Sequence, residues 1–302
     1  MLRTSCALCL AAVFAVSLAA PADAQRIRTR DRSASAAEAP IVDDEVIVRG
    51  RRMSEIENEL RIEIGKFIDE ISAVPMGRGL ARWDRSVCIG VHNLERTAAQ
   101  YIVDRISSLA LEVGLKPGEP GCFPEVVIVF TTDGKYLANY LVEERERLLR
   151  PTNLGGFHRG IAGMMRFAAT EQAVRWWHLS APVPTGGSAS PSRIYGDTVD
   201  VLWRVLIIVD STKLTGTTWQ QLGDYLALVS LVQVDLETNP RTFDSILNVF
   251  TNPAAYSGLT DWDRTYVRSL YDFDQQRIPE LQRGVLRNEM LNRALYPERE
   301  EE

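Results

Sequence analysis

The chain has few histidines and cysteines, the side chains that most often bind metals or act as nucleophiles in enzymes. Of 302 residues, three are histidine and four are cysteine. His92, His158 and His178 are far apart in the sequence, so no two of them form a ligand pair one helical turn apart. A G-x-S-x-G elbow, a Walker motif and a dinucleotide-binding glycine fingerprint are also absent. These absences exclude enzymes defined by such motifs. A Ser-His-Asp site stays open, because triads are defined by geometry and not by spacing.

An excess of positive charge is also missing. Lysine and arginine together number 34 against 40 acidic residues, for a formal net charge of −6. Nucleic acids and anionic membrane surfaces attract proteins with a basic excess. We therefore expect neither as a partner.

Long apolar runs are missing after the first 24 residues, which themselves have the pattern of a secretory signal peptide. Arg3 provides a basic start, residues 8–20 are apolar, and Ala22-Asp23-Ala24 is a small-x-small cleavage site. The apolar run is shorter than the roughly 20 residues of a membrane-spanning helix. We expect a mature protein that begins at Gln25, is periplasmic or extracellular, and has no transmembrane segment.

Only Cys88 and Cys122 lie outside the expected signal peptide. Two cysteines in an exported protein indicate one disulfide. Closing this loop of about 35 residues stabilises the fold by roughly 3.5–4 kcal/mol in the chain-entropy model. A free catalytic cysteine is the alternative, and the strand-like surroundings of Cys88 and the turn around Cys122 disfavour it.

Residues 25–52 have the composition of a disordered linker, with too little apolar surface to offset the entropy of ordering. Within it, residues 43–52 resemble the short extended segment near the N-terminus of TonB-dependent receptors. The resemblance implies that Glu45, Val46, Ile47 and Val48 add as a strand to a TonB-like partner. A plain linker is the simpler interpretation.

One globular domain is expected over residues 53–297, followed by an acidic tail over 298–302. Ser54 and Glu57 form a capping box at the start of the first helix. The segment 151–195 is expected to be irregular, with a short helix over 171–177. Strands are expected over 87–91, 126–130 and 199–209, and the other helices over 94–112, 132–149, 219–234, 243–250, 261–271 and 279–295. The order indicates an α+β fold: a mixed sheet packed on a buried central helix, with a helical C-terminal half.

The last part of the chain has an informative order of elements. A capped apolar helix over 217–235 follows a strand and precedes Ser245-Ile246-Leu247, and residues 259–271 then read L-x-x-x-D and L-Y. This order resembles the catalytic half of metzincin-type zincins, where an H-E-x-x-H helix precedes a Ser-Ile-Met-like turn. The resemblance implies a zincin-like fold with residues 245–247 beneath the central helix.

The zinc motif itself is missing from that helix. If Asp235 is aligned with the third zinc ligand of a metzincin, the first histidine falls at Tyr225, the catalytic glutamate at Leu226 and the second histidine at Val229. None of these side chains binds zinc or polarises a bound water. We therefore expect no metal and no other cofactor, and we interpret the helix as a buried core helix.

A second resemblance covers most of residues 53–271. The matching pieces are Arg82-Trp83, Gly121-Cys122-Phe123-Pro124, Val174-Arg175-Trp176-Trp177-His178, Gln221-Leu222-Gly223-Asp224-Tyr225 and Ser245-Ile246-Leu247. They are similar to an exported alphaproteobacterial family of unknown function, sphingomonad-like in character. This resemblance implies no activity.

Two classes of function remain. In the first, the protein is a non-catalytic, degenerate zincin-like scaffold that binds a protein or a cell-envelope component. In the second, it is a periplasmic hydrolase with its site near His158, Arg159 and His178. The missing ligand set favours the first, so we do not expect an enzyme. The tryptophans at 176 and 177 could line a cleft, but we expect them in the core.

Overall fold

The computed structural model describes residues 44–73, 77–150, 159–185 and 196–297, and for residues 44–52 it describes only the helical backbone. By its internal contacts the chain divides after Val48. Of residues 1–48 only 44–48 are described, at the start of helix α1. Residues 49–302 form the unit that carries the sheet. The expected signal peptide, the expected acidic tail and His158 lie outside the described residues.

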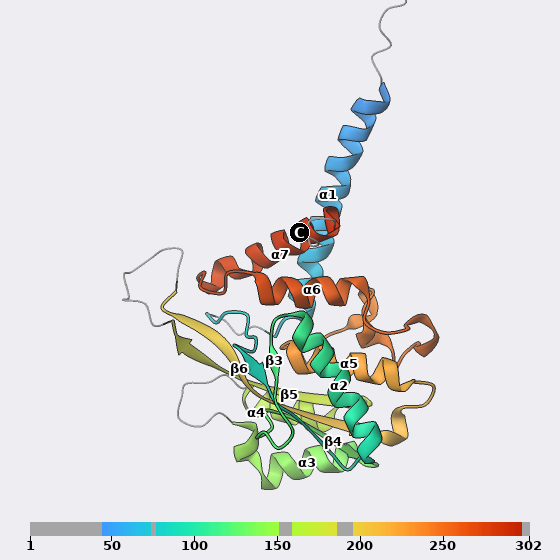
Figure 1. Ribbon diagram of the computed structural model, residues 1–302, viewed down its shortest axis with the longest axis vertical. Coiled ribbons are helices and arrows are strands. Elements are labelled where there is room, and N and C mark those ends of the chain that lie inside the picture. The colour runs from blue at the N-terminus through green and yellow to red at the C-terminus, as the bar shows by residue number, and fades with distance from the viewer. Residues whose placement is uncertain (1–43, 74–76, 151–158, 186–195, 298–302) are drawn as a thin grey trace, which may run out of the picture. The chain divides into compact units, whose positions relative to one another are not determined.

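A four-stranded mixed sheet forms the centre of this unit, in the order β2-β4-β6-β5 (Figure 1). Strands β2, β4 and β6 are parallel, and β5 pairs antiparallel with β6 at one edge. The β-branched composition of β4 and β6 suits strands whose two faces are both covered. The bounds are β2 (Ile89–His92), β4 (Val126–Thr131), β5 (Val174–Pro184) and β6 (Thr198–Asp210). A second, two-stranded sheet pairs β1 (Ser86–Val87) with β3 (Lys116–Pro117).

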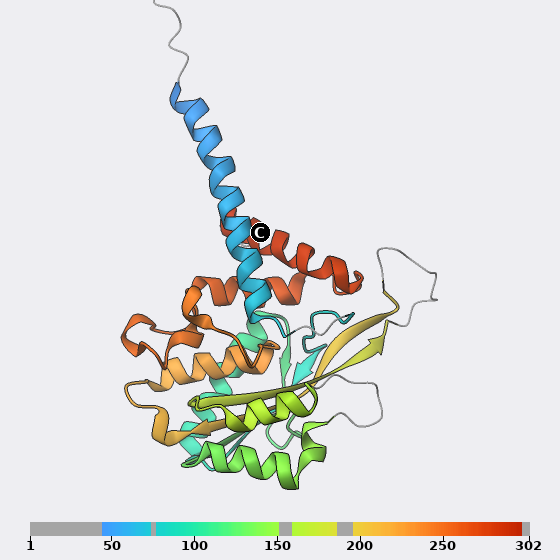
Figure 2. The same ribbon diagram turned by 180° about the vertical axis from the view of Figure 1, so that it is seen from behind.

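Helices cover both faces of the four-stranded sheet (Figures 1 and 2). The larger apolar core joins one face to α2 and α5, and includes Ile207 of β6. The smaller core joins the opposite face to α3 and α4, and includes the next residue, Ile208. Because successive side chains of a strand point to opposite faces, this neighbouring pair places the two helix layers on opposite sides. The bounds are α2 (Arg96–Glu112), α3 (Gly134–Glu144), α4 (Gly160–Ala169) and α5 (Trp219–Leu231), with a 3₁₀ turn η1 (Glu146–Leu149) after α3.

The remaining helices extend the larger core. Phe67 of α1 stacks against Phe243, Trp262 and Tyr266, with ring centroids 5.4 Å away in each case. This aromatic group joins α1 to α6, so α1 is part of the fold over its C-terminal turns. The bounds are α1 (Asp44–Ile71), α6 (Asp261–Asp272) and α7 (Pro279–Leu295), with short 3₁₀ turns η2 (Ser211–Lys213), η3 (Pro240–Thr242), η4 (Ile246–Asn248) and η5 (Pro253–Ala255).

The predicted disulfide is confirmed. Cys88 and Cys122 are bonded, with their Cα atoms 6.1 Å apart. The carbonyl of Cys88 also accepts hydrogen bonds of 3.0 Å from the backbone amides of Glu125 and Val126. The bridge therefore ties the junction of β1 and β2 to the turn before β4.

The single strand predicted over 87–91 is wrong. Val87 belongs to β1, and the Val87 carbonyl accepts a hydrogen bond from the amide of Gly118 at 2.9 Å. Ile89, in contrast, begins β2 and pairs with Val126. Cys88 separates the two because its carbonyl bonds to the turn before β4. Residues 87–91 therefore contribute to two different sheets.

The irregular segment predicted over 151–195, with a helix over 171–177, is also wrong in its described part. It contains helix α4 and the strand β5. Side chains from Val174 to Ala181 are all buried, so this strand lacks the alternation of apolar and polar residues that identifies a half-exposed strand. The predicted core location of Trp176 and Trp177 is confirmed, because their exposed fractions are 3% and 2%.

The start of the first helix also differs from the prediction. Helix α1 begins at Asp44, so residues 44–52 are helical and not an extended strand. Ser54 therefore lies inside the helix and does not cap it. Residues 25–43 lie outside the described residues.

The C-terminal half agrees best with the sequence. Strand β6 and helices α6 and α7 occur where they were predicted. The helix predicted over 132–149 ends at Glu144 and is followed by η1, and the one over 243–250 is reduced to η4.

Candidate functional site

Helix α5 is the central element around which the site is built. Thr218 caps it, and Gln221 completes the capping box by accepting from the Thr218 amide at 2.7 Å. Every side chain of α5 from Gln221 onward is buried. Tyr225 is 4% exposed, and Leu226 and Val229 are fully buried. The interpretation of this helix as a core helix is confirmed.

The C-terminal end of α5 is buried, although the last four carbonyls of a helix have no partner within it. The carbonyl of Leu228 accepts from the Val232 amide at 3.0 Å. The other three accept from side chains of distant segments. Val229 O lies 2.8 Å from His178 Nε2, Ser230 O accepts from Trp83 Nε1 at 2.9 Å, and Leu231 O accepts from Tyr271 Oη at 2.9 Å. Each carbonyl of the last turn is thereby satisfied.

His178 is therefore a structural residue in this arrangement. Because the Val229 carbonyl can only accept, the ring nitrogen Nε2 donates the proton. Burial lowers the pKa of His178 to about 4; the hydrogen bond with the Val229 carbonyl opposes this, and the nearby positive charge of Arg159 lowers the pKa further. The imidazole is thus neutral at neutral pH. Arg159 itself pairs with Asp235, Nη1 to Oδ1 at 2.8 Å. His92 is exposed at the end of β2.

The segment 245–247 packs against α5, as predicted. Asp263 of α6 holds it: Ser245 Oγ donates at 2.7 Å and the Ile246 amide at 2.8 Å. The amide and hydroxyl of Thr260 donate to the same carboxylate at 3.0 Å. Burial raises the pKa of Asp263, while these hydrogen bonds oppose the rise. The turn is fixed in place by the predicted L-x-x-x-D residue.

Beside α5 lies a cavity of about 490 Å³, called here the α5 cleft. One wall is aromatic: Tyr225 contacts Trp176 and Phe250, with centroid separations of 6.2 and 4.8 Å. The remaining lining residues are mainly polar, and they are Glu171, Gln172, Ala173, Lys213, Thr238, Asn239, Pro240, Arg241, Leu247 and Thr251. The cleft thus borders the start of β5, the end of β6 and the turn before η4.

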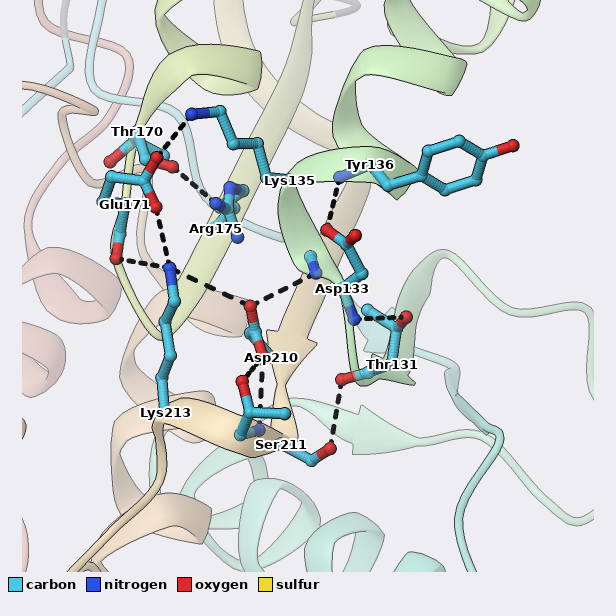
Figure 3. Close-up of polar contacts among 12 residues, drawn as sticks. Thr131, Asp133, Lys135, Tyr136, Thr170, Glu171, Arg175, Asp210, Ser211 and Lys213 are labelled. Atoms are coloured by element: carbon cyan, nitrogen blue, oxygen red, sulfur yellow. Dashed lines mark hydrogen bonds and ion pairs between the residues drawn. The ribbon is translucent and has the colours of Figure 1, made fainter.

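A charged cluster borders the cleft at the carboxyl ends of β4 and β6 (Figure 3). Glu171 accepts from Lys135 at 2.6 Å and from Lys213 at 2.9 Å. These two lysines lower the pKa of Glu171 to about 2, so the carboxylate is ionised at neutral pH. The group is exposed, and such pairs contribute little to stability. These ion pairs keep the ammonium group of Lys213, at the rim of the cleft, bound to Glu171.

Deeper in the same cluster, Arg175 is only 1% exposed. Its Nη2 donates to the Thr170 carbonyl, while its Nε and Nη1 make no hydrogen bond to the described residues. Burial lowers the pKa of Arg175, and the negative charge of Asp210 opposes this most strongly. Gly134 allows the close packing, because a Cβ there would collide with Arg175 Nη1. Arg175 is therefore enclosed by protein and does not reach the cleft.

Comparisons of the chain with protein-family models, with curated proteins and with solved structures found no match.

The three positions that the resemblance aligns with the zinc motif differ in their surroundings. Tyr225 lines the α5 cleft, whereas Leu226 and Val229 lie in the apolar core. Across the described ranges, His, Cys, Asp and Glu side chains do not gather in groups of three that could bind a metal ion. The same residues contain no helix that is both long and apolar enough to cross a membrane.

Of the three candidate catalytic residues, the structure places His178 and Arg159 together, and His158 lies outside the described residues. His178 and Arg159 are neighbours, but each is bonded to another group. The sequence reasoning missed the cleft residues Glu171, Lys213 and Arg241. Lys213 had a usable signal, because it closely follows the carboxyl end of the predicted strand over 199–209, and open α/β sheets bind ligands at such ends.

Proposed function

We propose that this protein is an exported, non-catalytic binding protein on a zincin-like scaffold, and that the α5 cleft is its ligand site. The observation that carries the proposal is the position of Tyr225. The resemblance aligns it with the first zinc ligand, and its ring forms the aromatic wall of a cavity of about 490 Å³. That volume is within the roughly 300–1,000 Å³ of small-molecule sites.

The order of elements around the cleft supports the zincin-like part of the proposal. The antiparallel edge strand β5 is followed by β6 and then by α5, and the turn 245–247 packs on that helix. The L-x-x-x-D and L-Y patterns also contain residues that hold these elements in place. Asp263 holds the turn, and Tyr271 holds the end of α5.

The proposed location is the periplasm or the cell exterior, and the proposed partner is a protein or a cell-envelope component. The disulfide between Cys88 and Cys122 supports export, because disulfides persist in oxidising compartments. The signal-peptide pattern of residues 1–24 is the second support.

Capture from a native envelope extract tests the proposal. The mature chain, residues 25–302, is immobilised beside two variants of matched size change. Thr251→Trp places an indole at the exposed lining of the cleft, and Thr198→Trp places one at the exposed start of β6. We expect a component that the parent and Thr198→Trp retain and Thr251→Trp loses.

Two results would refute the proposal. Equal capture by all three proteins would move binding away from the cleft. Stoichiometric zinc in the purified mature protein would contradict a non-catalytic scaffold.

We do not propose either of the two alternative functions, a hydrolase or a protein with a TonB-like partner. A hydrolase site at His178 and Arg159 would need the imidazole to leave the Val229 carbonyl and the guanidinium to leave Asp235. A TonB-like partner that adds a strand at residues 45–48 would need the start of α1 to unfold. Capture with residues 25–52 deleted tests the second idea, and we expect no change of partner.

A further inference from the structure

The lining of the α5 cleft has more positive than negative side chains, and one of the positive side chains has no partner among the described residues. The lining includes one carboxylate, Glu171, and two cations, Lys213 and Arg241. Lys213 donates to both the carboxylate and the carbonyl of Glu171, at 2.9 and 3.1 Å. Arg241 is exposed and makes no hydrogen bond or ion pair with the rest of the described chain. The cleft therefore presents one available positive charge.

That charge is a guanidinium, which matters for the type of anion. A planar guanidinium binds a carboxylate through two parallel hydrogen bonds, a geometry that an ammonium group does not offer. Arg241 lies in η3, which also holds Pro240 in the cleft lining. The preferred anion is accordingly a carboxylate at the mouth of the cleft.

The wall of the cleft indicates the rest of the ligand. Trp176, Tyr225 and Phe250 form a continuous aromatic series, with tilted or edge-on contacts between neighbours. Aromatic rings prefer such offset and edge-to-face contacts with one another, and they add binding energy beyond the buried area. Trp176 and Tyr225 are only 3% and 4% exposed, whereas Phe250 is partly exposed, so a ligand packs mainly on Phe250. An aromatic ring at that position continues the series of edge-to-face contacts, which an alkyl chain does not.

We propose that the α5 cleft binds an aromatic carboxylate, with its ring on the aromatic wall, chiefly on the partly exposed Phe250, and its carboxylate on Arg241. This inference rests on the proposed function and names the ligand class of the same site. Two sources have this chemistry: a small free aromatic acid, and a peptide that ends in an aromatic residue with a free carboxyl terminus.

Binding of four defined probes to the mature protein tests the inference. The first pair is 3-phenylpropionate and 3-phenylpropionamide, and the second is acetyl-Ala-Ala-Phe as the free acid and as the amide. The two members of each pair differ only in having a carboxylate or an uncharged carboxamide at the same position. Calorimetry gives the affinities, and tryptophan fluorescence reports on the wall because Trp176 lines the cleft.

We expect the acid of at least one pair to bind about tenfold or more tightly than its amide, as a charge-assisted hydrogen bond requires. Arg241→Gln should remove this difference. Arg147→Gln, at an exposed arginine of η1 outside the cleft lining, should keep it. Preference for the first acid indicates a small-molecule source, and preference for the second indicates a peptide terminus.

Three results overturn the inference: no binding of any probe, equal binding of acid and amide, or a difference that survives Arg241→Gln. None of them refutes the proposed function, because envelope capture that is lost in Thr251→Trp would still place a ligand of other chemistry in the cleft. Conversely, capture that ignores Thr251→Trp removes the proposed function whatever the probes show.

Discussion

Protonation of His178 should limit the stability of this protein at acid pH. An imidazole has a pKa of about 6.5 in an unfolded chain. In the folded protein, burial lowers the pKa of His178 to about 4. The unfolded state therefore binds a proton that the folded state does not, and stability falls as the pH drops from about 6.5 to about 4. This contribution is fully present above the unfolded pKa.

The size of the effect follows from these two values. At pH 5 the unfolded residue is almost fully protonated and the folded one is almost fully neutral. Linkage then gives a loss of about 2 kcal/mol between pH 7.5 and pH 5 from this one group. Carboxylates titrate in the same range, so the measurement must isolate His178 by substitution.

His178→Gln is the informative variant, because its side-chain amide keeps a donor for the Val229 carbonyl but does not titrate. Urea unfolding followed by tryptophan fluorescence, without reductant, gives the free energy of unfolding at both pH values. We expect the variant to lose about 2 kcal/mol less than the parent between them. His92→Gln, at an exposed histidine, is the matched control and should behave as the parent. Equal losses in the parent and in His178→Gln would refute the reasoning.

Three further predictions concern the same frame. Tyr271→Phe should lower the free energy of unfolding by about 1–3 kcal/mol, because the buried Leu231 carbonyl loses its donor. Tyr136→Phe, at a 69% exposed tyrosine, should change it little in the same denaturation assay. Phe67→Ala should cost about 3–5 kcal/mol, since three rings contact this side chain, and a loss below 1 kcal/mol would contradict its place in the core. Free-thiol labelling of the unfolded, non-reduced mature protein should detect no thiol, and substituting both Cys88 and Cys122 by serine should cost roughly 3.5–4 kcal/mol.

The elements that the sequence predicted well carry their signals locally. Helix α6 is capped by Thr260, which forms a capping box with Asp263, and its bounds agree with the prediction to within one residue. Strand β6 is rich in valine and isoleucine, most of all in its second half. In both cases the residues that decide the structure lie within the element itself.

The elements that were missed depend on distant contacts. Strand β5 is buried on both faces, so its pattern did not distinguish it from a short helix. Cys88 separates two strands only because the turn before β4 bonds to its carbonyl. The donors at the end of α5 are 40 to 147 residues away in sequence, so no local pattern could have identified His178, Trp83 and Tyr271 as a group.

The way the end of α5 is held also constrains how this protein can change in evolution. Three donors from separate parts of the chain satisfy three successive carbonyls, so the loss of any one leaves a buried acceptor unpaired. Substitutions at these sites are therefore expected to be rare and mutually dependent. Histidines at positions 225 and 229 would not by themselves create a zinc site, because Val229 is fully enclosed and a larger polar ring there would overpack the core. The packing of the central helix thus restricts the substitutions that its residues and their partners can accept. The exposed residues at the rim of the cleft are less restricted.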